Sequence, residues 1–175
     1  LAKPLPPVLV PPGRLVGLVG AGIVPVDALA ACTGTTTVSC TGASTSYSNG
    51  TNNLNLTVQP GATVSVVPLL GGTALSLTGS GVTLINNGRI DPALSGLSIV
   101  SNGTVVGNSA SASIVNVTNA SSGVMMGSTS SLLNGPALTV YNGIGGTTNI
   151  TNAGTIGTTG LLGFGAGPAA QVVTT

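Results

Sequence analysis

Charged residues are almost absent from this chain of 175 residues, which has three lysines and arginines, two aspartates, no glutamate and no histidine. Glycoside hydrolysis needs two placed carboxyl groups, and a serine nucleophile needs a histidine base. The carboxylates are Asp27 and Asp91, and Asp91 precedes a proline in a pattern typical of a turn. We therefore expect no catalytic residues, no metal, no cofactor and no small-molecule substrate.

The net charge is low, and aromatic side chains are rare. A formal net charge of +1 offers no electrostatic footprint for nucleic acid, so we expect no nucleic-acid partner. Aromatic residues make up 2% of the chain, and tryptophan is missing. Such a composition cannot fill a globular core with large side chains, although it can stack small ones in a narrow coil. A surface without charge repulsion also favours association.

Long helix-forming stretches are missing too, and short β-branched runs take their place. Runs at 82–85, 97–100, 114–117 and 138–141 alternate roughly between apolar and polar residues and are bounded by glycine, serine and asparagine. This pattern predicts short strands that put alternate valine, isoleucine and leucine into a thin apolar core.

The runs belong to a repeat. Similar openings with a small residue before an apolar pair occur at 73–76, 92–95, 111–114 and 136–139, and a fifth begins at 168. The interval is the same between the first three openings and then lengthens twice. A repeat of about 20 residues that lengthens by insertion is typical of a solenoid. We predict an all-β fold: a short right-handed parallel β-solenoid of about six rungs over residues 32–175, after an extended Pro/Gly-rich segment at 1–31.

Each repeat closes on a turn that contains asparagine or glycine, two residues that adopt positive φ at little cost. Equivalent asparagines would stack their amides in a ladder along the coil, whereas unrelated turn residues would not. The predicted turn and ladder residues are Asn86, Gly88, Asn102, Gly103, Asn119, Gly123, Asn152 and Gly154.

The segment at 1–31 is different in kind. A proline-rich stretch at 3–12 precedes an apolar run at 15–24, which is too short to span a bilayer as a helix. The small residues at 28–32 resemble a signal-peptide cleavage site or a lipobox. We nevertheless expect the whole segment at 1–31 to be retained and to pack against protein. It either caps its own coil or adds to a neighbouring subunit as a strand. The predicted assembly residues, including two near the C-terminus, are Pro4, Pro6, Pro7, Val8, Leu9, Val10, Leu15, Val16, Leu18, Val19, Val172 and Val173.

Cys32 and Cys40 are the only cysteines. No histidine or nearby carboxylate accompanies them, which excludes a metal site and a thiol protease. An even pair in a chain poor in charge predicts one hairpin disulfide and an oxidising compartment. Two reduced thiols in an apolar rung are the alternative.

The cysteine pair with its flanking threonines, together with the stretches 53–58, 61–64, 74–77 and 86–90, resembles the opening region of proteobacterial autotransporter passengers and related surface proteins. The similarity covers about residues 32–157. It implies a β-solenoid at the extracellular cell surface.

Three functions fit a β-solenoid of this composition. The C-terminal stretch 169–175 reads as a strand without a cap, which predicts head-to-tail stacking into an extracellular homopolymeric filament with roles in adhesion or biofilm. The alternative is a cell-surface adhesin that does not polymerise and binds host or abiotic surfaces. An ice-binding array is disfavoured because the threonines do not recur at the predicted period.

Overall fold

The computed structural model describes residues 32–66, 72–92, 101–129, 135–160 and 169–174. The segment at 1–31, with the assembly residues predicted in it, and the predicted strand at 97–100 lie outside these ranges. The described residues form sixteen strands and no helix. In this part of the chain, therefore, nothing helical is long and apolar enough to cross a membrane.

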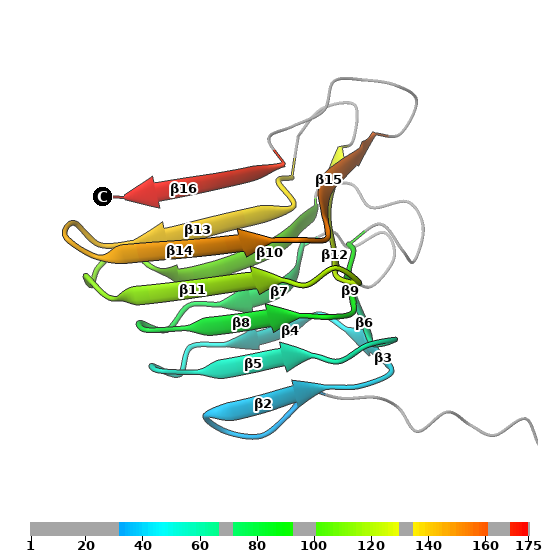
Figure 1. The fold of residues 1–175 in the computed structure, drawn as a ribbon, viewed down its shortest axis with the longest axis horizontal. Helices are drawn as coiled ribbons and strands as arrows, with labels where there is room; N and C mark the ends of the chain where they lie inside the picture. The colour runs from blue at the N-terminus through cyan, green and yellow to red at the C-terminus, as the bar shows by residue number, and fades with distance from the viewer. Residues whose placement is uncertain (1–31, 67–71, 93–100, 130–134, 161–168, 175) are drawn as a thin grey trace, which may run out of the picture.

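The strands form three sheets that wind into a β-solenoid (Figure 1). Sheet A contains β1 (Cys32–Thr33), β2 (Thr37–Cys40), β5 (Asn55–Val58), β8 (Thr83–Asn86), β11 (Ile114–Asn119) and β14 (Thr147–Asn152). Sheet B contains β3 (Ala43–Thr45), β6 (Thr63–Ser65), β9 (Arg89–Ile90), β12 (Val124–Thr129) and β15 (Thr155–Gly160). Sheet C contains β4 (Tyr47–Asn49), β7 (Gly72–Leu77), β10 (Ser101–Asn108), β13 (Leu138–Asn142) and β16 (Ala170–Thr174).

The chain passes through the sheets in the order A, B, C, and we call each such set of three strands a coil. Every pair in the three sheets is parallel except β1 with β2. Figure 1 shows sheet A running from left to right in front and sheet C returning behind it, while the coils rise from β2 to β16. This path is right-handed, so the predicted fold class is confirmed.

The predicted repeat differs from the observed one. The described residues form five coils, whereas about six were predicted, because each sheet receives one strand per coil and sheets B and C have five described strands each. Register partners in sheet A lie farther apart in the sequence toward the C-terminus, from Thr37 with Asn55 to Asn116 with Asn149. Longer strands account for part of this growth, since β2, β3 and β4 have three or four residues each whereas β11, β12 and β13 have five or six. Longer connections between the strands account for the rest.

The predicted openings are likewise not all equivalent. The openings at 73 and 136 belong to sheet C, where Leu75, Thr104, Leu138 and Ala170 are in register. The opening at 111 instead leads into β11 of sheet A, and most of the opening at 92 lies outside the described residues. Short alternating strands occur on all three sheets, so similarity of sequence alone did not identify the sheet.

The core consists of columns of apolar side chains that stack from coil to coil. In sheet A, Val38, Leu56, Leu84 and Val117 form one such column, and all four are buried. Strands β6, β9 and β12 contribute Val64, Ile90 and Met125, while sheet C contributes Leu77, Val106 and Val140. Each column buries apolar surface that an isolated coil would leave in water, which makes every coil dependent on its neighbours.

Candidate functional site: the open end of the solenoid

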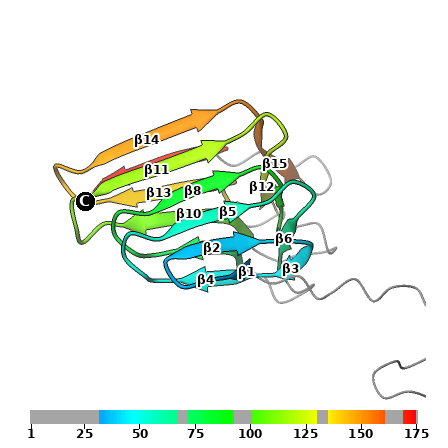
Figure 2. The ribbon, with the colours of Figure 1, turned by 60° about the horizontal axis from the view of Figure 1, so that its bottom comes forward.

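The two ends of the solenoid are built differently. At the N-terminal end, which is turned toward the viewer in Figure 2, β1 pairs with β2. This pairing is antiparallel and places Cys32 opposite Cys40. A disulfide joins these two cysteines, and Cys32 and Tyr47 pack against the core. Val38 and Cys40 are each only 1% exposed although they belong to the first coil. The core is therefore closed at this end.

The core is open at the other end, which is formed by β14, β15 and β16 (Figure 1). Val172 continues the column of Val106 and Val140, yet it is 50% exposed whereas they are fully buried. Ile150 continues the column of Val117 and is 38% exposed. Within the described ranges, no further coil covers the inward-facing side chains of the last coil.

A ladder of asparagine amides runs through the corner between sheets A and B and reaches this end. Asn86, Asn119 and Asn152 are in register on β8, β11 and β14. The Asn86 amide donates to the Asn119 oxygen at 2.8 Å, and the Asn119 amide donates to the Asn152 oxygen at the same distance. Asn86 and Asn119 are buried, while Asn152 is exposed.

The predicted glycines lie beside the ladder. Gly88, Gly123 and Gly154 immediately precede the strands β9, β12 and β15. A Cβ atom on Gly154 would lie 2.2 Å from the backbone carbonyl oxygen of Gly123. A Cβ atom on Gly123 would lie 2.4 Å from the backbone carbonyl oxygen of Asn86. These glycines let successive corners approach closely enough for the amides to bond.

Asn102 and Gly103, also predicted for the ladder, lie elsewhere. Both belong to β10 in sheet C, where Asn102 is paired with Thr73. Gly103 is buried, and a Cβ atom there would lie 2.1 Å from the Met126 oxygen. Asn-Gly therefore marks a close backbone approach here without joining the ladder.

A buried asparagine that the ladder prediction did not include occupies a different corner. Asn142, at the end of β13, accepts from the Ser113 backbone N–H and donates to the Ser113 and Thr147 carbonyls. It thereby fastens the turn between sheets C and A. The Asn142-Gly143 dipeptide indicates a turn at this position, but it does not indicate that the Asn142 side-chain amide is buried.

The outer face of sheet A carries a second polar array. One column contains Thr37, Asn55, Thr83, Asn116 and Asn149, and the next contains Ser39, Thr57, Ile85, Thr118 and Thr151. No strand of this array presents a Thr-x-Thr pair, because asparagine stands in the first column on β5, β11 and β14. Ile85 also interrupts the hydroxyls of the second column, and Asn116 and Asn149 bond to each other at 2.9 Å.

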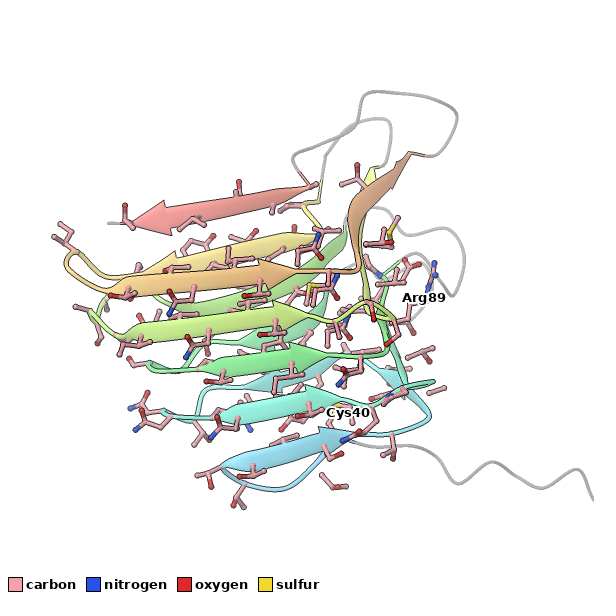
Figure 3. The ribbon with its side chains drawn as sticks, viewed as in Figure 1. Cys40 and Arg89 are labelled. Atoms are coloured by element: carbon pink, nitrogen blue, oxygen red, sulfur yellow. A yellow bond between two sulfur atoms is a disulfide. The ribbon has the colours of Figure 1, made fainter. Side chains whose placement is uncertain are left out.

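Among the described residues, the only charged side chains are Arg89 and Asp91, which form an ion pair on the sheet B side (Figure 3). The Arg89 Nε donates to the Asp91 carboxylate at 3.0 Å, and Asp91 is buried. No group of three metal-ligating side chains occurs in the described part of the chain. The surface that it presents is thus almost entirely neutral.

No family model, curated protein or solved structure is significantly similar to this chain. The fold and the geometry of its two ends therefore carry the functional argument.

Proposed function

We propose that this protein is a structural rod of the extracellular cell surface, a β-solenoid that is lengthened by a further coil stacked on its open end. The observation that carries the proposal is the loss of burial in the last coil, where Ile150 and Val172 are exposed at positions that the two preceding coils bury. Covering these side chains removes apolar surface from water, at about 25 cal/mol per Å². In the described part of the chain, no strand pairs with the outer edge of β14, β15 and β16, and this edge offers the matching backbone hydrogen bonds.

The location rests on the disulfide and on the resemblance to autotransporter passengers. A disulfide persists in an oxidising compartment such as the cell exterior. A neutral rod without clustered charges suits adhesion and display better than catalysis. Its lateral faces, such as the asparagine and threonine columns of sheet A, would contact host or abiotic surfaces.

A head-to-tail homopolymer is the second candidate, favoured by the same open end. In such a filament the first coil of the next copy would cover Ile150 and Val172. The closed N-terminal end weighs against this arrangement, since β1 occupies part of the sheet A edge that the contact would need. Only the edges of β3 and β4 face that end without a paired strand among the described residues. We therefore favour the rod that does not polymerise.

Photo-crosslinking in native material distinguishes these arrangements. A benzophenone amino acid replaces Val172 at the open end, and a matched control replaces Val105, a partly exposed valine of β10 in sheet C. The rod predicts a crosslink from position 172 to a β-coil segment, with far less from position 105. Crosslinks to residues 37–49 of a second copy, together with fibres in negative stain, would establish the filament. An open end that crosslinks to no polypeptide would contradict both arrangements.

A further inference from the structure

The asparagine ladder has a direction. The Asn86 amide donates to the Asn119 oxygen and to the carbonyl of Val124 at 3.2 Å. The Asn119 amide repeats this arrangement one coil later, donating to the Asn152 oxygen and to the carbonyl of Thr155 at 3.1 Å. Val124 and Thr155 are the first residues of β12 and β15. Each amide therefore bonds to two acceptors that the following coil supplies.

Asn152 is the last described member of the ladder, and only the oxygen of its side-chain amide takes part in a ladder hydrogen bond. Its oxygen accepts from Asn119, whereas within the described ranges its amide nitrogen has no hydrogen-bond acceptor. This nitrogen is accessible to water while Asn152 is exposed. A coil that covers the open end removes that water and must provide an acceptor in its place.

The first coil of a second copy does not offer this acceptor. Below Asn86, the register continues through Val58 to Cys40. An in-phase second copy would thus place Cys40, whose sulfur is bound in the disulfide, over Asn152. Sulfur is a weak acceptor, so in this contact the Asn152 amide would keep only the carbonyl of Ala43, the first residue of β3, and would lose its side-chain acceptor.

From this asymmetry we propose that the open end selects a β-coil whose sheet A strand ends in asparagine, in register with Asn152. The same coil presents apolar residues over Ile150 and Val172. Its asparagine oxygen and the first carbonyl of its sheet B strand accept from the Asn152 amide, as in the two preceding coils. This inference rests on the proposed function and adds the chemical identity of the covering coil.

The test appends one coil to the chain in place of Thr175. A second copy of residues 143–174 follows Thr174, so that the appended coil carries asparagine at the ladder position. A matched protein has leucine at that appended position. A third combines the leucine coil with N152L, since replacing both partners by apolar groups removes the unsatisfied amide.

We expect the asparagine coil to slow hydrogen exchange of the Asn152 side-chain amide by about tenfold, the effect of one buried hydrogen bond. The leucine coil on the native chain should give a melting temperature lower by about 2–4 °C than the asparagine coil. The third protein should recover most of that loss.

The outcomes separate this inference from the function on which it rests. If the asparagine and leucine coils stabilise the chain equally, and the Asn152 amide exchanges equally in both, the selection of asparagine is overturned while the rod stands. If neither coil raises the melting temperature or slows exchange in β14 and β16, the open end accepts no coil and the proposed rod fails as well.

Discussion

The side chains of Asn86 and Asn119 are hydrogen-bonded at 2.8 Å inside the solenoid, although 33 residues separate them in the sequence. The bond crosses from one coil to the next and lies where both side chains are shielded from water. Together with Asn152 it joins the last three coils. A buried polar column of this kind stabilises one register, because a shifted strand would leave its amides without partners.

The buried ladder should contribute more to the free energy of unfolding than a similar hydrogen bond on the surface. Replacing Asn119 with leucine leaves the buried Asn86 amide without its side-chain acceptor and frees the carbonyls of Gly123 and Thr155. We expect N119L to lower the free energy of unfolding by roughly 2–3 kcal/mol, measured by urea denaturation. The control is N149L, which removes an exposed bond to Asn116 and should change stability by less than about 0.5 kcal/mol. Equal effects would contradict the structural role of the ladder.

The corner glycines should tolerate no side chain. In the Gly123→Ala protein, the new Cβ atom would lie 2.2 Å from the Asn119 oxygen and 2.4 Å from the Asn86 backbone oxygen. Relieving this clash requires the coils to separate locally, and we expect a cost of about 2–3 kcal/mol in thermal or urea unfolding. Gly157→Ala is the control, since the nearest atoms there are 3.8 Å away, on the Met126 side chain. A Gly123→Ala protein as stable as the native one would contradict the close approach of successive coils at this corner.

Thr104 is a site where a hydrophobic substitution should stabilise the protein. Its hydroxyl is buried and, within the described part of the chain, has no hydrogen-bond partner. It occupies the register between Leu75 and Leu138. Because T104V removes an unpaired polar group, we expect a gain of about 1 kcal/mol in the free energy of unfolding. The control T139V should give no gain, because the Thr139 hydroxyl accepts from the Gln171 amide.

The disulfide should stabilise the first coil without being needed for the rest. It links residues eight apart in sequence, so it restrains only a short loop of the unfolded chain. We expect the double variant C32A/C40A to lose about 2–3 kcal/mol while keeping its β-rich circular dichroism spectrum. Unreduced native protein should have a mass lower by two hydrogen atoms than the reduced form. Two free thiols, or a lipid on Cys32, would contradict the intrachain bond.

Local sequence was sufficient for the fold class and for the strand-forming runs. The alternating runs at 114–117 and 138–141 lie in β11 and β13, and the run at 82–85 overlaps β8. These predictions depend on residue type and on the period of two, which are local properties. The pairing of Cys32 with Cys40 could also be predicted, since no other cysteine exists in the chain.

Only the tertiary structure decided which asparagines stack. Asn86 and Asn102 each stand in a short polar turn sequence, yet one lies in sheet A and the other in sheet C. Corner loops of different length separate the coils, so sequence spacing does not reveal the register. Hydrogen bonds between strands that are distant in sequence fix it instead. The same pairings bury Val38 in the first coil and leave Val172 half-exposed in the last one. This difference depends on which strands lie next to each residue in the folded chain, and local sequence does not contain that information.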